Sequence, residues 1–245
     1  MFERVYNKEA TPLRTFNMET KLNRPRSLGI IMDGNRRFAR ERGIQKIEGH
    51  LLGYAKAVEV LRWCREEGVQ YVTLYAFSTE NWQRSPEEIS YLLELFATKL
   101  PELSVVQEEG GAVVFIGEVE RFGEPLVSIM RSIEAKNPTH PTGTVAVALS
   151  YGGRLEIVTA INALLREGAS EISEGDFSKK LWTAGIPDPE LIIRTGGEQR
   201  LSNFLPWQSV YSELFFTPTY WPEFSKEEFI SILDNFAERE RRHGR

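Results

Sequence analysis

The chain has 245 residues, of which 41% are apolar and 27% are charged, and 35 acidic against 30 basic residues give a formal net charge of -5 at pH 7. This composition is enough for one substantial hydrophobic core. The negative net charge argues against a general nucleic-acid binder, which needs a positive surface field. A single cysteine, Cys64, excludes an internal disulfide framework. With no leader-like or membrane-spanning apolar run, we expect a cytoplasmic protein.

Residues 1–26 are polar and without clear periodicity, and basic residues outnumber acidic ones in this segment. We interpret the segment as a basic N-terminal arm. Two roles remain open for it: a solvated tail, or a weak contact with an anionic membrane surface.

Beyond the arm, short apolar runs alternate with segments of helical periodicity. The runs predict strands over residues 28–32, 71–77, 112–116, 144–149, 191–193 and 214–216. The periodic segments predict helices over residues 51–67, 86–106 and 154–166, near 129–133, and after Ser225. This alternation, without linker or repeat, predicts a single α/β domain over residues 27–245, with a mostly parallel central sheet flanked by helices. Ligands of such sheets bind at the carboxyl ends of the strands.

Chemically useful side chains follow the first predicted strand. A carboxylate at a strand end can hold a hard cation such as Mg²⁺, and the start of a following helix offers backbone N–H groups to an anion. An arginine there can hold phosphate oxygens through two hydrogen bonds, and Lys46 and His50 can add further donors. A helix-capping turn with solvated arginines remains the alternative. The segment reads Asp33-Gly34-Asn35-Arg36-Arg37-Phe38.

A run of polar and aromatic residues follows the second predicted strand. Its serine and asparagine can fix a ligand or handle a proton, and its tryptophan can cover an apolar or cationic group. A capped loop is an equally good interpretation, because Ser85, Pro86 and Glu88 have the pattern of a helix start. The run reads Ser78-Thr79-Glu80-Asn81-Trp82-Gln83-Arg84.

Two further segments follow later strands. The double glycine of residues 150–154 favours a simple strand-to-helix turn. The second segment has the composition of a diphosphate cradle, because two arginines flank a double glycine and a serine follows. It reads Arg194-Thr195-Gly196-Gly197-Glu198-Gln199-Arg200-Leu201-Ser202-Asn203. Glu213, an isolated acid beside apolar residues, needs a metal or a salt bridge as its partner.

Together these segments resemble the cis-prenyltransferases, the undecaprenyl diphosphate synthase family, over nearly the whole chain from residue 27 to residue 245. The chain has no DDxxD motif of the trans-prenyl enzymes, and it has neither a phosphate loop nor a GxGxxG motif. The matching blocks are Ile31-Met32-Asp33-Gly34-Asn35-Arg36-Arg37, Gly49-His50, the segment from Leu74 to Trp82, Tyr151-Gly152-Gly153-Arg154, and the segment from Ile193 to Phe204.

The resemblance implies an enzyme that condenses isopentenyl diphosphate with an allylic diphosphate, either farnesyl or geranylgeranyl diphosphate. Its product would be a long-chain polyprenyl diphosphate, a lipid-carrier precursor for glycan or cell-wall synthesis. The implied cofactor is Mg²⁺, with Asp33 and Glu213 as its ligands, and the implied catalytic residues are Asp33 and Asn81. Ser78 is a second candidate for proton removal. The implied substrate-binding residues are Gly34, Asn35, Arg36, Arg37, Phe38, Lys46, His50, Ser78, Thr79, Glu80, Trp82, Arg84, Arg194, Arg200, Leu201, Ser202, Arg242 and Gly244.

Two of these positions depart from the family pattern, since Lys46 and Phe38 stand where the family more often has arginine and tryptophan. The resemblance also implies an elongated hydrophobic tunnel for the growing product. The apolar stripe of residues 86–106 is its natural wall, although core packing explains that stripe equally well. Ala76 is small and leaves room for a long chain.

The C-terminal residues Arg242-His243-Gly244 resemble the family's Arg-x-Gly tail, which reaches the neighbouring subunit's site, so we expect a homodimer. We expect no nucleic-acid partner, and a peripheral membrane contact for product release stays open. Two other functions compete. One is a non-catalytic partner subunit, which would lack the first Asp-Gly-Asn-Arg block. The other is a haloacid-type phosphatase, which would need an acid where Asn35 stands.

Overall fold

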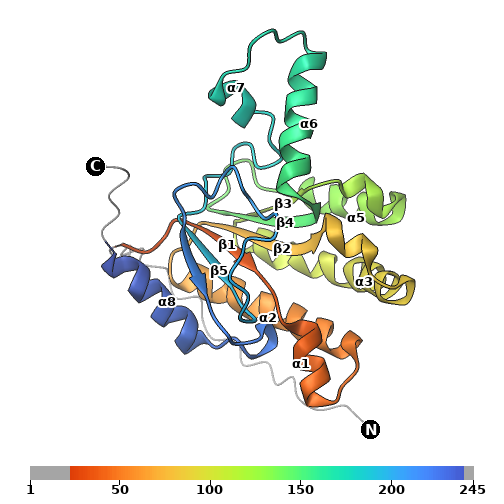
Figure 1. Cartoon of the computed structure of the whole chain (residues 1–245), viewed down its shortest axis with the longest axis vertical. Helices are drawn as coiled ribbons and strands as arrows, with labels where there is room; N and C mark the ends of the chain where they lie inside the picture. The colour runs from red at the N-terminus through yellow and green to blue at the C-terminus, as the bar shows by residue number, and fades with distance from the viewer. Residues whose placement is uncertain (1–22, 240–245) are drawn as a thin grey trace.

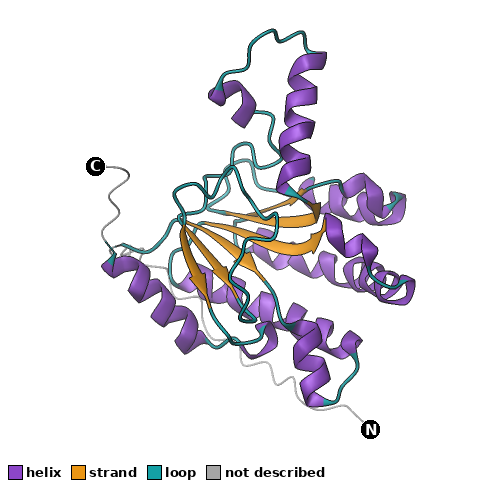
Figure 2. Cartoon of the chain, in the orientation of Figure 1, coloured by secondary structure: helices purple, strands orange, loops and turns teal. Residues whose placement is uncertain are grey.

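The computed structural model describes residues 23–239, which form an α/β fold around one sheet. All strand pairs in this sheet are parallel, and the strand order is β3-β4-β2-β1-β5-β6 (Figures 1 and 2). The predicted strands are confirmed, with small changes at their ends. The strands are β1 (Ser27–Ile31), β2 (Tyr71–Ser78), β3 (Ala112–Ile116), β4 (Thr144–Tyr151), β5 (Leu191–Arg194) and β6 (Glu213–Phe216).

The helices that follow these strands differ from the sequence prediction at two places. The single helix predicted over 86–106 is divided into α3 and α4, and α7 was not predicted. The helices are α1 (Asn35–Arg42), α2 (Lys46–Glu66), α3 (Pro86–Lys99), α4 (Ser104–Glu108), α5 (Glu124–Glu134), α6 (Gly153–Arg166), α7 (Glu174–Ser178) and α8 (Lys226–Glu238). Short 3₁₀ segments are η1 (Thr79–Gln83), η2 (Leu100–Leu103), η3 (Val119–Phe122) and η4 (Trp221–Glu223).

Local sequence signals explain where α3 begins and ends. Ser85 caps its first turn by accepting a hydrogen bond from the backbone N–H of Glu88, and Pro86 occupies the first helical position, as predicted. Pro101 lacks an N–H group and cannot continue an α-helix. The chain therefore passes through the 3₁₀ segment η2 before α4 begins.

The two faces of the sheet are covered differently. Buried residues of α2, α3, α5 and α8 form the large core cluster with one face. The opposite face packs against irregular segments that include Trp182, Phe204 and Leu205. Helix α6 projects away from the sheet with α7 beside it (Figure 1), and the two share a small apolar cluster around Leu164 and Phe177. No helix in residues 23–239 is both long enough and apolar enough to cross a membrane.

Most of the predicted N-terminal arm, residues 1–22, lies outside the described residues. Two of its predicted members belong to the folded body. Arg24 forms ion pairs with Glu67 (3.2 Å) and Asp234 (2.7 Å), and Arg26 lies over the ring of Tyr71. The body therefore begins before the predicted boundary at residue 27.

The outer edge of strand β3 is closed by side chains. Asn137 accepts a hydrogen bond from the backbone N–H of Val113 (2.8 Å) and donates one to its carbonyl (2.7 Å), as a neighbouring strand would do. The carboxylate of Glu134 accepts from the N–H of Phe115 (2.8 Å). Exposed edge strands invite pairing with other chains, and these side chains occupy the groups that would pair.

We predict that Asn137→Ala lowers the free energy of unfolding by about 2 kcal/mol, because two strand groups lose their partners. Urea denaturation measures the effect. Asn235→Ala, which removes an exposed amide on α8, is the control and should change stability by less than about 0.5 kcal/mol. Equal effects of the two substitutions would contradict this role for Asn137.

Candidate active site

The candidate site is a cleft of about 700 Å³ at the carboxyl ends of the strands. The strand register places Ile31 of β1 between Tyr75 of β2 and Arg194 of β5, so the segments that follow these strands meet. This edge of the sheet is where the sequence predicted a ligand. The predicted residues that line the cleft are Asp33, Asn35, His50, Ser78, Glu80, Asn81, Arg84, Arg194 and Ser202.

Asp33 lies at the centre of the cationic groups. Its two carboxylate oxygens pair with Arg194 (Nη2–Oδ2, 2.9 Å) and Arg37 (Nη2–Oδ1, 3.2 Å). Burial alone would raise the pKa of Asp33. The hydrogen bond from Arg194 and the charges of Arg37 and Arg194 outweigh burial, and they hold this pKa below its usual range. The carboxylate is therefore ionised at neutral pH.

Arg194 connects Asp33 to a second group of hydrogen-bond donors. Its Nη1 atom donates to the hydroxyl of Ser202 (2.8 Å) and to the carbonyl of Arg200. Arg200 in turn donates from Nε to the same hydroxyl (3.2 Å). Glu198 pairs with Arg200 and with Arg37 (3.5 Å), which keeps these guanidinium groups together. This arrangement is a cradle of donors for an anion, and we call it the Ser202 cradle.

Glycine is required where this segment approaches β1. Gly196 has a φ of +85°, and a Cβ atom on it would lie 2.7 Å from Nη2 of Arg37 and 3.1 Å from the backbone of Asp33. The predicted double glycine therefore allows the cradle to close against Asp33.

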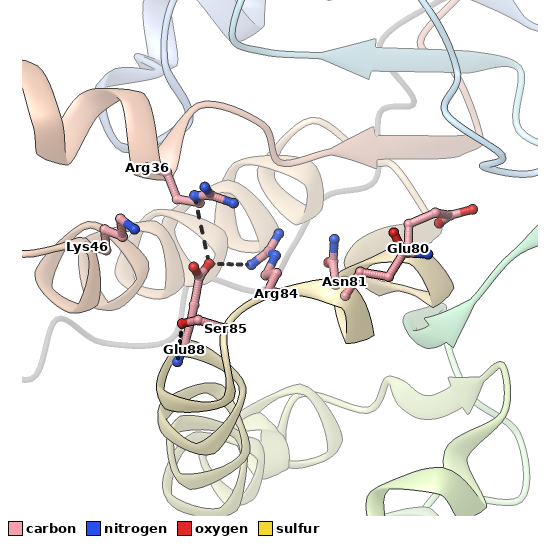
Figure 3. Close-up of a pocket in the computed structure, with 8 residues that line it drawn as sticks. Arg36, Lys46, Glu80, Asn81, Arg84, Ser85 and Glu88 are labelled. Atoms are coloured by element: carbon pink, nitrogen blue, oxygen red, sulfur yellow. Dashed lines mark hydrogen bonds and ion pairs between the residues drawn. The ribbon is translucent and has the colours of Figure 1, made fainter.

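A second basic group lies on the other side of the cleft, in an adjoining hollow of about 440 Å³ (Figure 3). Arg36 and Arg84 point toward one carboxylate, that of Glu88, at 3.9 Å and 3.0 Å. Lys46 lines the same hollow and forms no ion pair within residues 23–239. Because Glu88 is nearly buried, it holds the two guanidinium groups in place and leaves their outer N–H groups for another anion.

His50 completes this basic group in an uncharged form. Its Nε2 atom lies 3.4 Å from Glu88, and its side chain is nearly buried. Burial and the nearby positive charge of Arg84 lower the pKa of His50, and these effects outweigh the charge of Glu88. At neutral pH the imidazole is therefore a neutral hydrogen-bonding group.

Asn81 presents its amide nitrogen to the cleft. Its Oδ1 atom accepts a hydrogen bond from the backbone N–H of Ser78 (3.1 Å), which closes the turn after β2. This bond fixes the orientation of the amide, whose Nδ2 is the donor group. The predicted cap at Ser85 is present as well, so capping at the start of α3 and a turn that orients Asn81 occur in the same loop.

Two polar atoms at the cleft are buried without a hydrogen-bond partner in the described part of the chain. They are Oδ1 of Asn35 and Nε of Arg194. Gly49 and Gly53 of α2 allow the close approach of Asn35, since Cβ atoms there would lie 2.5 Å and 2.2 Å from its oxygens. Unpartnered buried groups are unusual in folded proteins and are typical of binding sites.

Other predicted residues lie outside the cleft lining. Trp82 is one of them: its indole N–H donates to the buried Ser150 (2.9 Å), and its ring packs on Phe77 and Phe122, with the guanidinium of Arg121 over it. Leu201 packs on the smaller core cluster instead of the cleft, because its apolar side chain is more stable there. The other predicted residues outside the lining are Gly34, Phe38 and Thr79, which contribute to backbone geometry or to contacts outside the cleft.

Glu213 is not a partner of Asp33 within this chain. It is the first residue of β6 and is paired in register with Leu191, whereas the cleft lies beyond Arg194 at the other end of β5. Three residues of strand separate these ends by about 10 Å. Glu213 instead forms an ion pair with Arg239. The structure therefore does not bring Glu213 to Asp33 within residues 23–239, because residue 213 begins β6 at the end opposite the cleft. Glu213 as a second metal ligand stays a prediction.

The structure adds cleft residues that were not predicted as site residues. Tyr75, Arg154 and Asn203 supply polar groups, and Met32 and Leu92 supply apolar ones. Alternation along the strand could have indicated Tyr75. Arg154 and Asn203 lie in segments that the sequence singled out, but their side chains were not predicted to reach the cleft. Arg242 and Gly244 lie outside the described residues.

The chain matches a family model described as "Putative undecaprenyl diphosphate synthase" over residues 31–244. It is 45% identical over 234 residues to an isoprenyl transferase of Thermus thermophilus, covering 90% of this chain and 89% of that relative. It is 44% identical over 235 residues to a tritrans,polycis-undecaprenyl-diphosphate synthase (geranylgeranyl-diphosphate specific) of Thermoplasma volcanium, covering 92% and 91%.

Solved structures show the same similarity in three dimensions. Lavandulyl diphosphate synthase from Lavandula x intermedia, in complex with dimethylallyl diphosphate, has a TM-score of 0.84 and 31% identity over 90% of this chain and 98% of that one. A probable undecaprenyl diphosphate synthase from Campylobacter jejuni has a TM-score of 0.76 and 31% identity, covering 91% and 100%. The strand-end blocks that carry the cleft lie inside the matched residues. The chain belongs to the undecaprenyl diphosphate synthase family of prenyltransferases.

Proposed function

We propose that this protein elongates a prenyl chain with cis double bonds, condensing isopentenyl diphosphate with farnesyl or geranylgeranyl diphosphate in the cytoplasm. The product is a long-chain polyprenyl diphosphate, a lipid-carrier precursor for glycan or cell-wall synthesis. The observation that carries the proposal is the pair of basic groups that meet at Asp33 beside an apolar wall. Relatives that are named isoprenyl transferase and undecaprenyl-diphosphate synthase support it.

The two basic groups suit two diphosphates. We assign the allylic diphosphate to the hollow of Arg36, Lys46 and Arg84, next to α1, and isopentenyl diphosphate to the Ser202 cradle. Guanidinium groups bind phosphate oxygens through paired hydrogen bonds, and here two carboxylates, Glu88 and Glu198, hold them in position before a substrate arrives. The leaving diphosphate gains charge in the transition state, so donors that are already oriented stabilise it most.

Mg²⁺ is the proposed cofactor, and Asp33 is the residue that would hold it. Mg²⁺ binds proteins through one or two carboxylates and completes its shell with water and substrate phosphates, so an ionised carboxylate between the two proposed diphosphate sites fits its chemistry. No three His, Cys, Asp or Glu side chains of residues 23–239 gather into a closed metal cage. When bound, the cation would neutralise diphosphate charge.

The reaction breaks the allylic carbon–oxygen bond, forms one carbon–carbon bond to isopentenyl diphosphate, and releases one proton. Asn81 offers Nδ2 as a donor, and a neutral amide is a very weak base, so we assign it to orienting the substrate or a water molecule. It does not take the proton. A diphosphate oxygen or a water molecule is the acceptor that remains.

The apolar side of the cleft suits the growing chain. Met32, Ala76 and Leu92 line it, and α3 continues this wall with Phe96 in the aromatic cluster beneath. We propose that the chain extends along α3 in a hydrophobic tunnel and that Ala76 leaves room for it.

Subunit contacts and product release are part of the proposal. Val210 and Tyr211 expose 70% and 69% of their surface, which favours a homodimer in which the tail with Arg242 and Gly244 reaches the partner's site. Ile47 and Leu51, exposed next to Lys46, support a peripheral membrane contact for release of the product.

Asp33→Asn keeps the shape of the side chain and removes its charge, so we predict a loss of prenyl transfer of about 10²-fold or more. The measurement follows incorporation of labelled isopentenyl diphosphate with farnesyl diphosphate and Mg²⁺. Asp176→Asn on α7 is the control, since its exposed carboxylate pairs only locally with Lys179 and Ser173. Retention of full activity by Asp33→Asn would overturn the proposed function.

Ala76→Leu should shorten the products by one or more isoprene units, because the larger side chain fills the apolar side of the cleft. Chromatography of the dephosphorylated products measures chain length. Ala135→Leu adds the same volume at an exposed position after α5 and should leave the distribution unchanged. An unchanged distribution for Ala76→Leu would place the growing chain elsewhere.

Deletion of residues 241–245 should raise the KM for isopentenyl diphosphate about tenfold, because the proposed tail contact is a charge-assisted hydrogen bond. Arg245→Gln leaves Arg242 and Gly244 in place and is the control. Mixed dimers of the deleted chain and the Asp33→Asn chain should regain the KM of the unmodified protein, because one site then has both an intact core and a tail. A mixed dimer that keeps the raised KM of the deleted chain would argue against a tail that acts on the partner.

A further inference from the structure

The segment after the Ser202 cradle has a strained backbone. Ser202, Asn203 and Leu205 have φ values of +50°, +68° and +47°, a region that residues other than glycine rarely adopt. Such a conformation is strained and persists only where surrounding contacts hold it. Asparagine tolerates this conformation better than most residues, and Asn203 lies at the centre of these contacts.

Asn203 joins three separate segments at the cleft. Its Nδ2 atom donates to Oε1 of Glu80, in the loop after β2 (3.1 Å). Its Oδ1 atom accepts the backbone N–H of Arg154 (2.9 Å), and its carbonyl accepts the N–H of Gly153 (2.8 Å), both after β4. The segment after β5 is thereby fastened to the segments after β2 and β4.

The double glycine of residues 152–153 makes room for this junction. A Cβ atom on Gly152 would lie 2.8 Å from Nδ2 of Asn203 and 2.6 Å from Oγ1 of Thr79. A Cβ atom on Gly153 would lie 1.9 Å from Pro206. These glycines do more than turn the chain, because they let three strand-end segments come into contact.

The chemistry of the junction requires an amide. Hydrogen bonds from Ser78 and Asn203, together with the backbone, outweigh burial and lower the pKa of Glu80, so Glu80 is an ionised acceptor. The N–H of Arg154 needs an acceptor, and Glu80 needs a donor. The asparagine side chain supplies both at once, whereas an aspartate would supply only the acceptor.

We propose that Asn203 is a positioning residue that holds the Ser202 cradle in register with the Asn81 loop and so sets the alignment of the two diphosphates. The inference rests on the proposed function, in which the cradle binds isopentenyl diphosphate. Tyr75 also helps to hold the cradle, because its hydroxyl lies 3.2 Å from the carbonyl of Ser202 and 3.2 Å from that of Tyr151.

The test exchanges donor and acceptor across the junction. Asn203→Asp keeps the acceptor for Arg154 but loses the donor and places two carboxylates together. Glu80→Gln keeps an acceptor oxygen for Asn203. In the double variant the amide of Gln at position 80 can donate to the carboxylate at position 203, and the net charge equals that of the unmodified protein.

Calorimetry with isopentenyl diphosphate alone measures binding without any reaction. We expect affinity to fall about tenfold for Asn203→Asp, to fall less for Glu80→Gln because an acceptor oxygen remains for Asn203, and to return in the double variant toward the value of Glu80→Gln. In turnover assays, the KM for isopentenyl diphosphate should rise most in the variants that bind isopentenyl diphosphate most weakly, while the KM for the allylic substrate changes little. Asn235→Asp on α8 adds the same charge outside the cleft and should bind as the unmodified protein does.

Asn203→Gly is a second, neutral variant. It keeps the backbone conformation and removes both side-chain bonds, so it should weaken binding as Asn203→Asp does even if the aspartate variant fails to fold. Unchanged affinity in Asn203→Gly, a double variant no better than Asn203→Asp, or an unmodified protein that binds no isopentenyl diphosphate overturns the inference. Restored binding in the double variant of a protein that makes no prenyl product keeps the inference and refutes the proposed function.

Discussion

The arrangement of the cleft depends on the burial of one guanidinium group. Arg194 ends β5 with only 4% of its side chain exposed, and a buried cation is tolerated only when it is paired and hydrogen-bonded. Asp33 supplies the charge, and the hydroxyl of Ser202 with the carbonyl of Arg200 supplies the acceptors. The end of β1 and the segment after β5 must therefore meet at this group. Arg37 and Arg200 are arranged around that meeting point, through Asp33 and Ser202.

Local pairing of charges also explains how a chain with a negative net charge can have a cleft suited to anions. The net charge of -5 describes the whole sequence, but a ligand responds to the cleft. There, single carboxylates act as anchors: Glu88 gathers Arg36 and Arg84, and Glu198 gathers Arg37 and Arg200. Each anchor reduces the mutual repulsion of the guanidinium groups and restricts their rotamers. The site is thus organised before its ligand binds, which lowers the entropy lost on binding.

Sequence patterns predicted much of this arrangement because several signals are local. The apolar runs located all six strands, and Ser85 with Pro86 located the start of α3. Asp33 and Arg194 could be assigned to the site because the ends of parallel strands meet at one edge. The pattern was less informative where two interpretations had the same composition. Trp82 is as suitable for a core as for a ligand, and the structure shows its ring against the core and its indole N–H bonded to Ser150.

The sequence by itself determined the α/β class, the family and the residues that end the strands. Periodicity, capping signals and strand-end motifs each depend on residues that are close together in the sequence. Only the tertiary structure decided which of those residues meet. The register of β5 with β6 places Glu213 at the strand end opposite the cleft. The loops bring Asn203 within hydrogen-bond distance of Glu80, which is 123 residues away in the sequence. Such pairings depend on strand register and loop conformation, which are set by the packing of the whole chain and leave no local signal.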